Sequence, residues 1–450
     1  MTISISKAIE VKPNGIQKLN RASFIEVLVD SGKFATYQGG LYLKSETGIF
    51  TLVQKCNANS ALRKLFTNED NLLISSAALS EAYRTLIELP ILNVELMNPP
   101  NLVRLKNGIF DIQTGKLIPP DDELLFSFAL NADFVEDATL DDAPNFKRFL
   151  FETFGEDDQS VLLLRQVLAH ILSNQFSFKG SFFFIGVPSA GKSVLIKLLR
   201  TVIPHTSALP LHQFDERFSL AMLKGMHANL SDEIAAAKIS GWDVFKKLTS
   251  GDKVVIETKG FQPEDCILKT HLVFAGNWMP QAHDFDTLAI LDRIVLLYFP
   301  HHVPPDKRNP NLIADLVMEK SVIVSWALTE LPQLINSNYA FAKPVLAVEY
   351  LKRYAQDINS VEDFIKDCIA LGATDDKVHT NVLWEGYKKY CNHNAINPQP
   401  LQTLKTSLSL LNGVTYGKFR VLGSPPAYGY RGLKLIPATE SKEDDEQHVN

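Results

Sequence analysis

Hydrophobic and polar positions change their spacing several times along the chain, and each change predicts a different kind of element. Residues 1 to about 95 mix short apolar stretches with polar turns, which indicates an α+β region. The segment 102–119, LVRLKNGIFDIQTGKLIP, alternates around two glycine-containing turns and predicts β-hairpins. From Pro144 to about Ser173 the apolar residues recur at helical spacing, so helices are expected there.

The stretch from about 175 to 338 alternates strand-like and helix-like segments. Short apolar runs typical of buried strands are SFFFIG at 181–186, KTHLVFAG at 269–276 and IVLLYF at 294–299. Between the first two runs, KSVLIKLLRTVI at 192–203 has the apolar spacing of a helix. This alternation predicts an α/β fold with a parallel sheet that helices cover on both faces.

The last hundred residues predict a smaller unit after a linker near 340–345. Three helices are expected at 361–370, 382–391 and 401–411, followed by two strands at 414–423 and 428–437. Three helices with a β-ribbon indicate a winged-helix-like domain. The expected organisation is an α+β region at 1–95, hairpins and helices at 96–174, the α/β core at 175–338, the winged-helix-like domain at 345–437 and an acidic, disordered tail at 438–450.

Composition narrows the class of protein. With 46% hydrophobic and 21% charged residues in 450, the chain can bury a core and is not disordered throughout. The formal net charge of −6 excludes a globally basic nucleic-acid binder but leaves room for local basic patches. The four cysteines form no CxxC pair, no apolar run is long enough to span a membrane, and the N-terminus lacks the apolar core of a signal peptide. We therefore expect a cytoplasmic protein of a bacterium or a virus-infected cell, without a membrane partner.

The segment GVPSAGKS matches the pattern G-x-x-x-x-G-K-[ST], in which a glycine-rich loop wraps around phosphates. Lys192 would supply positive charge to the β- and γ-phosphates, and the Ser193 hydroxyl would ligate Mg²⁺. The alternative is a strand–turn–helix without a ligand, but the apolar run before the motif and the helix after it favour ATP and Mg²⁺ as cofactors. The predicted ATP-binding residues are Gly186, Val187, Pro188, Ser189, Ala190, Gly191, Lys192 and Ser193.

A nucleotide hydrolase also needs carboxylates near the metal and the attacking water. HANLSDE at 227–233 offers Asp232 and Glu233 directly after a short strand candidate. Asp232 would hold Mg²⁺ together with Ser193, and Glu233 would polarise the attacking water. The alternative for an Asp-Glu pair is a solvated surface turn. The position of this pair after a phosphate loop favours a role in nucleotide hydrolysis.

Two further polar residues follow or precede apolar runs. Asn277 ends HLVFAGN, where its amide could contact the γ-phosphate or align the water. Arg293 precedes IVLLYF, a place where a charged residue is normally a cap or a surface residue. In a ring of ATPases such an arginine reaches the nucleotide of the neighbouring subunit, where it is worth roughly 10³–10⁵ in rate. The predicted catalytic residues are Lys192, Asp232, Glu233, Asn277 and Arg293.

Five motifs occur in a fixed order along the chain: GVPSAGKS, LSDE, SGDKVVIETKG, HLVFAGNWMP and LDRIVLLYFP. With these motifs the chain resembles the superfamily III helicases and, within them, the phage, plasmid and poxvirus primase-helicase group. The likeness covers about residues 100–437. It implies an AAA+-type P-loop ATPase core that forms a homo-hexameric ring and moves along single-stranded DNA using ATP.

The same resemblance implies that residues 246–261 form a hairpin in the pore of the ring. Lys259 near the hairpin tip and Phe261 are the best candidates for contacting DNA, because a lysine pairs with phosphate and an aromatic ring stacks on a base. Lys247 and Lys253 are weaker candidates. A solvated surface hairpin is the alternative.

The winged-helix-like segment carries several cations on its third helix and wing. A winged helix can place a helix in the major groove and a wing on the backbone, which would suit recognition of origin DNA or capture of a strand. Docking of another protein is the alternative. The first 95 residues contain no convincing acidic pair with a downstream histidine, so a separate primase, or loss of that activity, is expected. The cations of this segment are Lys405, Lys418, Arg420, Arg431 and Lys434.

Three functions fit these observations. The leading one is a replicative DNA helicase that hydrolyses ATP at subunit interfaces. The second is a DNA-replication initiator or loading platform that uses ATP as an assembly switch and unwinds little, and the third is a DNA-packaging type of motor on duplex DNA. Lys192, Asp232 and Glu233 together favour hydrolysis over a switch, and the single-strand type of hairpin favours a helicase over packaging.

Overall fold

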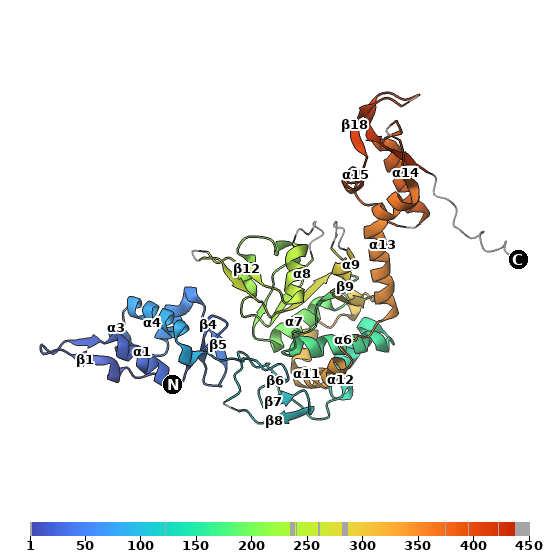
Figure 1. Ribbon diagram of the computed structural model, residues 1–450. Helices are drawn as coiled ribbons and strands as arrows, with labels where there is room; N and C mark the ends of the chain where they lie inside the picture. The colour runs from blue at the N-terminus through green and yellow to red at the C-terminus, as the bar shows by residue number, and fades with distance from the viewer. Residues whose placement is uncertain are drawn as a thin grey trace.

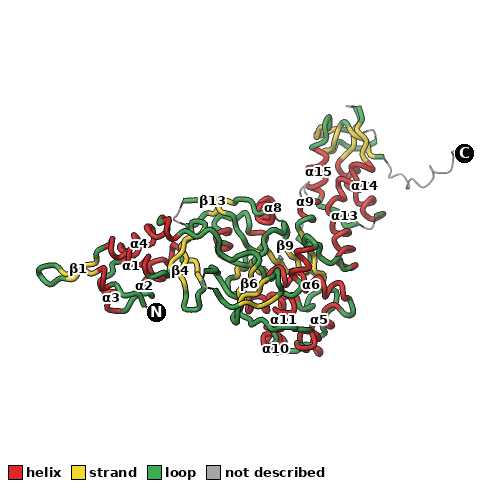
Figure 2. The backbone as a smooth tube through the Cα atoms, turned by 60° about the horizontal axis from the view of Figure 1, so that its bottom comes forward, coloured by secondary structure: helices red, strands yellow, loops and turns green. Residues whose placement is uncertain are grey.

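The fold is described from a computed structural model of the 450-residue chain. Figure 1 shows a central α/β body, an N-terminal unit on one side of it, and a C-terminal unit at the end of the long helix α13 (Val345–Cys368). Figure 2, which is turned by 60°, also shows the two outer units at opposite ends of the body. The structure describes residues 2–121, 123–234, 239, 241–259, 262–280, 287–373, 375–394, 396–421 and 423–436.

A five-stranded parallel sheet forms the middle of the central body, as the alternating pattern predicts. Its strand order is β10-β11-β14-β9-β15, so the first strand in sequence, β9, lies between the last two. Every residue of β9 is buried, as expected for the apolar run SFFFIG. The strands are β9 (Ser181–Gly186), β10 (Thr206–Ser207), β11 (Ala228–Ser231), β14 (His271–Gly276) and β15 (Ile294–Phe299).

Helices cover both faces of this sheet, because alternate side chains of each strand enter different cores. On β9, Phe182 and Phe184 belong to one hydrophobic cluster, whereas Phe183 and Ile185 belong to the other. The first cluster includes residues of α5 (Pro144–Phe154), α6 (Asp158–Leu172), α7 (Lys192–Val202), α10 (Leu312–Met318), α11 (Lys320–Leu328) and α12 (Leu331–Asn336). The second includes residues of η5 (Leu211–Gln213), η6 (Ser219–Leu223), α8 (Trp242–Ser250), α9 (Thr287–Leu291) and the start of α13.

The predicted hairpins after residue 100 form a three-stranded antiparallel sheet. This sheet shares the first core of the body, since Val103 and Phe110 are buried in the same cluster as the strand residues Phe182 and Phe184. A separate two-stranded hairpin, formed by β12 (Val254–Ile256) and β13 (Glu264–Cys266), projects from the body (Figure 1). The sheet's strands are β6 (Leu102–Arg104), β7 (Ile109–Asp111) and β8 (Lys116–Ile118), and short helices η4 (Leu140–Asp142) and η7 (Pro305–Lys307) occur elsewhere in the body.

The N-terminal unit has a core of its own, built from four helices and two small antiparallel sheets. Side chains of Asn20, Thr67 and Ser75 accept hydrogen bonds from backbone N–H groups at the starts of α1, α3 and α4, so each of these helices has an N-cap. Its elements are η1 (Ser6–Ala8), β1 (Ile9–Val11), β2 (Gln17–Leu19), α1 (Arg21–Asp30), β3 (Phe34–Tyr37), β4 (Gly40–Lys44), β5 (Phe50–Leu52), η2 (Lys55–Asn57), α2 (Ala58–Arg63), α3 (Asn68–Leu73), α4 (Ser76–Glu88) and η3 (Pro90–Leu92).

The C-terminal unit contains the three predicted helices, but its first helix starts earlier than expected. Helix α13 begins at Val345, because its first half packs Tyr350 and Tyr354 against the second core of the body. Residues 369–370 were expected to be helical and instead start β16, which pairs with β20. The predicted last strand is broken at Gly432, where φ is +86° and an added Cβ would lie 2.4 Å from the Gly413 oxygen.

The described part of this unit has two antiparallel sheets, β16-β20 and β17-β19-β18, around a separate core. Among the described helices of the whole chain, none combines the length and the apolar character that a membrane crossing requires. The elements that follow α13 are β16 (Ile369–Leu371), β17 (Lys377–His379), α14 (Thr380–His393), α15 (Leu401–Ser409), β18 (Thr415–Phe419), β19 (Ala427–Arg431) and β20 (Leu433–Leu435).

Candidate nucleotide-binding site

The glycine-rich loop joins the end of β9 to the start of α7, and two of its glycines are required by close backbone contacts. An added Cβ at Gly186 would lie 2.1 Å from the Phe299 carbonyl oxygen, and one at Gly191 would lie 2.6 Å from the Phe149 ring. Gly191 has φ of +96° and Ser189 has φ of +60°, so the loop turns twice through the left-handed region. These turns let the backbone wrap around a small space directly in front of the N-terminus of α7.

The segment after β15 supports this loop from the outside. The Phe299 carbonyl accepts a hydrogen bond from the Val187 N–H at 3.1 Å, and the Ser189 carbonyl accepts one from the Val303 N–H at 3.2 Å. The ring nitrogen Nδ1 of His302 donates to the Pro188 carbonyl at 2.8 Å. The residues that fix the loop therefore come from a segment more than 100 residues later in the chain, which no local motif could reveal.

Lys192 lies under the loop with only 7% of its surface exposed. Its Nζ donates to the carbonyl oxygens of Gly186 and Val187 at 2.8 and 2.7 Å. Burial lowers the pKa of this amine from its ordinary value, because desolvation disfavours the charged form and no described carboxylate forms an ion pair with it. An anion held by the loop would provide the missing opposite charge.

Asp232 and Glu233 follow β11, which the sheet places next to β14 and one strand away from β9. The Asp232 carboxylate is about half exposed and forms an ion pair with Arg200 of α7, Oδ2 to Nη1, at 3.2 Å. Arg200 also donates to the Leu230 carbonyl through Nη2 at 2.6 Å, so it fixes the end of β11 to the helix of the loop. Sequence reasoning missed Arg200, since nothing in its local sequence distinguishes it from an exposed helical arginine.

Asn277 follows β14, the direct neighbour of β9. Gly276 is in register with Ile185, which brings Asn277 alongside the first residue of the loop. An added Cβ at Gly276 would lie 2.9 Å from Ile234, so the strand end and the segment after Glu233 approach each other closely. Because parallel strands end at the same edge, the loop, the acidic pair and the amide meet in one place.

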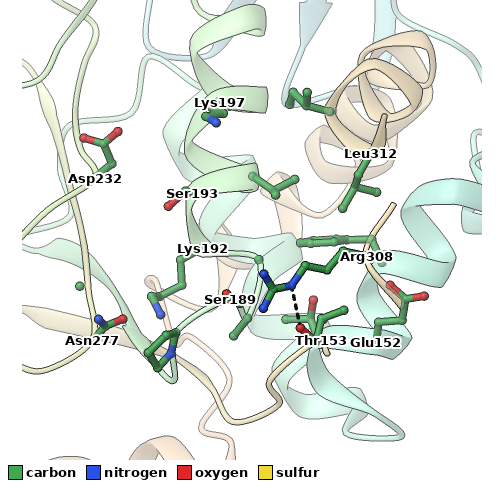
Figure 3. Close-up of a pocket in the computed structure, with 18 of the residues that line it drawn as sticks. Glu152, Thr153, Ser189, Lys192, Ser193, Lys197, Asp232, Asn277, Arg308 and Leu312 are labelled. Carbon is green, nitrogen blue, oxygen red and sulfur yellow. Dashed lines mark hydrogen bonds between the residues drawn. The ribbon is translucent and has the colours of Figure 1, made fainter. Parts of the chain in front are cut away.

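One cavity of about 1000 Å³ connects these residues. In Figure 3, Lys192, Ser193, Asp232 and Asn277 lie on one side of it, and Arg308, Thr153 and Glu152 lie on the other. The volume is at the upper end of the range for small-molecule sites and is large enough for a nucleoside triphosphate. Its lining includes all of Pro188–Ser193 together with Asp232, Glu233, Asn277 and Trp278.

Arg308 is a cation of this cavity that the sequence did not indicate. Its Nε donates to the Val303 carbonyl at 2.9 Å, the hydrogen bond drawn in Figure 3, which leaves the guanidinium facing the cavity. Lys197, one turn of α7 after Ser193, adds another positive charge to the lining. Lys197 lies close in sequence to the loop, a signal too weak to select it, and no local pattern points to Arg308.

Arg293 does not line this cavity. It precedes β15, and Ile294 is in register with Ser181, the first residue of β9, so Arg293 lies at the opposite end of the sheet from the loop. Its guanidinium donates to the Ala289 carbonyl at 2.5 Å and to the Ser250 hydroxyl at 3.2 Å. Action of this arginine on a neighbouring subunit stays a prediction.

The predicted DNA-binding lysines lie outside the cavity, on and beside the β12–β13 hairpin. Lys259 is exposed in the connection between the two strands, Lys253 is exposed just before β12, and Lys247 is exposed on α8. None of the three forms an ion pair with a described acidic residue, whereas Glu257 and Glu264 of the same hairpin are paired with Arg217 and Lys224. Phe261 lies outside the described residues, and so do residues 438–450 of the predicted tail.

No cluster of three or more histidine, cysteine or carboxylate side chains with metal-binding geometry occurs in the described parts of the chain. Mg²⁺ does not need one, because it usually takes one or two carboxylates, a hydroxyl, waters and the phosphates of its nucleotide. Ser193 and Asp232 offer that donor set within one cavity. The residues present therefore fit a magnesium–nucleotide complex.

Two segments of the chain match known families. Residues 184–293, which hold the loop, the acidic pair and Asn277, match a family described as DUF5906, a family of unknown function. Residues 37–155 match the family described as D5 N terminal like. The description of the first family names no activity. The second match supports a relation to D5-type primase-helicases, which is the broader part of the resemblance found in the sequence.

Solved structures with low similarity cover most of the chain. Two structures of the C-terminal region of NrS-1, an A form apo structure and an apo structure of its residues 305–718, are each 12% identical to this chain and have a TM-score of 0.45. The similarity covers 91% of this chain and 98% or 99% of those chains. Over residues 37–155 the chain is thus similar to the D5 N terminal like family, and it joins that segment to a parallel α/β body with a phosphate-type loop.

Proposed function

We propose that the protein is an ATP-dependent DNA helicase of the replicative primase-helicase type, which works as a ring on single-stranded DNA. The observation that carries this proposal is the convergence of Lys192, Ser193, Asp232, Glu233 and Asn277 on one cavity at the carboxyl edge of the parallel sheet. Numbered in chain order, the sheet reads 5-1-4-3-2, so the strand that leads into the loop is flanked by a strand on each side. The D5 N terminal like segment supports the replicative role.

In this proposal the phosphates of ATP lie in the loop and accept hydrogen bonds from its backbone N–H groups. Lys192 exchanges its two carbonyl contacts for the β- and γ-phosphate oxygens, a stronger pairing because both partners are charged. Ser193 and Asp232 would hold Mg²⁺, which neutralises phosphate charge when bound. Arg200 keeps the Asp232 carboxylate oriented toward the cavity through its ion pair.

Hydrolysis needs a water activated next to the γ-phosphate. Glu233 accepts a proton from that water, the water oxygen forms a bond to the γ-phosphorus, and the bond to the β–γ bridging oxygen breaks to leave ADP and phosphate. Asn277 orients the water or the γ-phosphate by hydrogen bonding. Arg293 of the next subunit would neutralise charge that develops on the transferred group.

Coupling to DNA falls to the exposed hairpin. Lys259 in its connection, with Lys253 and Lys247 nearby, forms a basic group that can follow the phosphates of a single strand. The pairing of Glu257 and Glu264 with cations removes the acidic charge that would otherwise repel the strand. Movement of these hairpins with each ATP cycle would pull the strand through the ring.

The test is the ATPase rate of the full chain with and without single-stranded DNA, measured on the wild type and on Lys259→Ala. We expect stimulation by DNA in the wild type, its loss in Lys259→Ala, and unchanged DNA-independent hydrolysis in that variant. Lys116→Ala is the matched control, because it removes an exposed lysine of β8 that lies outside the hairpin. An ATPase that ignores single-stranded DNA would point instead to an ATP-switched initiator, and hydrolysis that follows blunt duplex would point to a packaging-type motor.

A further inference from the structure

Two tyrosine rings are stacked in solvent on the β-ribbon of the C-terminal unit. Tyr416 of β18 is 50% exposed and Tyr428 of β19 is 57% exposed, yet their ring centroids lie 5.7 Å apart with planes 17° from parallel. Both face the same side of the ribbon, because Tyr416 pairs with Tyr430, two residues beyond Tyr428. The pair therefore presents an ordered aromatic surface to water.

Buried Tyr430 lies on the same face of the ribbon and packs against the ring of Tyr416. It is 1% exposed, its ring lies 5.0 Å from that of Tyr416, and its hydroxyl donates to the Lys405 carbonyl on α15 at 3.0 Å. Large aromatic side chains usually bury most of their surface, so an ordered exposed pair indicates a contact with another molecule.

The charge around the pair favours a polyanion. Lys418 is exposed on β18 and sits opposite Tyr428 in the strand register, and Arg420 follows at the end of that strand. No aspartate or glutamate occurs in the sequence from residue 386 to 439, a stretch that includes the whole ribbon and α15. Lys434 is paired with Asp376, whereas Lys418 and Arg420 form no ion pair with a described acidic residue.

The neighbouring helix argues for a single strand rather than a duplex. The exposed positions of α15 are Gln402, Thr406 and Ser409, all neutral, and its one cation, Lys405, is only partly exposed. A helix laid into a major groove would therefore bring little charge to the flanking phosphates. Stacking on tyrosine needs an unpaired base with a free face, which only a single strand offers.

We propose that the β18–β19 ribbon is a second nucleic-acid site, which binds a single strand by stacking bases on Tyr416 and Tyr428 and pairing phosphates with Lys418 and Arg420. This site is separate from the β12–β13 hairpin and does not depend on ATP. The expectation of origin DNA on the third helix and wing stays a prediction. Its position at the end of α13, away from the sheet, suits the capture of a strand before or after the motor (Figure 1).

The test measures binding of the full chain, without nucleotide, to fluorescent oligonucleotides of about 15 residues by anisotropy. We expect Tyr416→Ala and Tyr428→Ala each to raise the Kd for oligothymidine about 10-fold, since each variant loses the ring on which one base stacks. Tyr416→Phe and Tyr428→Phe are the matched controls, because they keep the ring and lose only the hydroxyl, and they should bind like the wild type. An oligouridine arm shows whether RNA uses the same two rings.

Several outcomes would overturn the proposal. One is an unchanged Kd in both alanine variants, and another is an equal loss in the alanine and phenylalanine variants. A loss confined to duplex DNA would favour groove binding and would also reject it. As a measurement on the intact protein, photocrosslinking with a bromodeoxyuridine oligonucleotide should label the peptide around Tyr416 or Tyr428, and absence of label on both rejects stacking. Because ATP is absent throughout, these results do not depend on whether the motor function holds.

Discussion

The two ends of the parallel sheet both carry polar residues, but their surroundings differ completely. At the carboxyl end, Asp232 and Asn277 open onto a cavity of about 1000 Å³. At the amino end, His227 and His271 precede or begin their strands and join His170 of α6 in a cluster in which each side chain is 4% exposed or less. The comparison teaches that strand direction, rather than residue type, decides which polar residues can meet a ligand.

The buried histidines are packed as ring systems. His170 lies 4.9 Å from His271 and His271 lies 5.0 Å from His227, between ring centroids. His227 and His271 each place Nε2 near a backbone carbonyl, of Ile171 at 2.7 Å and Ser173 at 3.0 Å. Their role is therefore to tie the amino ends of two strands to the end of α6, a structural role that needs no ligand.

Arg293 is the exception to this rule, because it lies at the amino end of the sheet and is nevertheless predicted to act in catalysis. Arg293→Ala should lower the ATPase rate about 10³-fold if it completes the site of a neighbouring subunit. Mixing Arg293→Ala with Lys192→Ala chains should then restore part of the activity, since mixed rings contain some interfaces with both residues. Steady-state ATPase of the mixtures measures this.

The control for Arg293 is Ser250→Ala, which removes one hydrogen bond of the guanidinium but keeps its charge. That variant should hydrolyse ATP within a few-fold of the wild type if charge is what matters. No restoration in any mixing ratio, with normal thermal unfolding of both variants, would mean that Arg293 only connects α9 and α8 within its own chain.

Sequence reasoning found the residues that end strands or lie in the loop, and it missed those that tertiary contacts bring in. Lys192, Asp232 and Asn277 each follow an apolar run, so the expected parallel sheet already implied that they meet. Arg308 and His302 enter the site from the segment after β15, whose conformation depends on packing rather than on a pattern. Helix α13 was predicted too short for the same reason, since its first turns are fixed by contacts with the body.

Glu233→Gln sharpens the comparison at the carboxyl end. Removing the carboxylate that accepts the proton from water should lower hydrolysis about 10²–10⁴-fold while leaving ATP binding nearly unchanged, because glutamine has the same shape. Single-turnover hydrolysis and nucleotide-binding titrations separate the two effects. Glu156→Gln, an exposed carboxylate outside the cavity, is the control and should behave like the wild type. Equal loss of binding and hydrolysis would assign Glu233 to binding.

Arg200 tests whether the ion pair behind the site matters. Arg200→Ala should raise the Mg²⁺ concentration needed for half-maximal ATPase about 10-fold, because Asp232 loses the partner that orients it. Arg200→Lys should recover part of the effect by keeping a charge near Asp232 without the contact to the Leu230 carbonyl. A lower maximal rate with an unchanged Mg²⁺ requirement would show that Arg200 acts through the strand end instead.

The smallest effect is expected at the amino end, in the dependence of stability on pH. Burial lowers the pKa of all three histidines, His271 from its ordinary value of 6.5 to about 4, and the neighbouring imidazoles add to this at His170 and His227. The other titratable groups beside the described cluster are His205 and Tyr339. Below pH 6.5 the unfolded chain takes up protons that the folded chain cannot, so the free energy of unfolding should fall as the pH drops from 6.5 toward 4, by at most about 1.4 kcal/mol per pH unit for each histidine.

His170→Phe isolates one member of this cluster. Neither ring nitrogen of His170 has a hydrogen-bond partner among the described residues, and the side chain lies between Phe178 and Phe182, so a phenylalanine ring suits its surroundings. The variant should fold, keep its ATPase rate at pH 8, and lose less stability than the wild type between pH 6.5 and 5. Chemical denaturation at both pH values measures this, with His393→Gln, an exposed histidine on α14, as the control. If the wild type and His170→Phe lost the same stability, His170 would not contribute to the pH dependence. The two ends of the sheet would then differ only in whether a ligand can reach their polar residues.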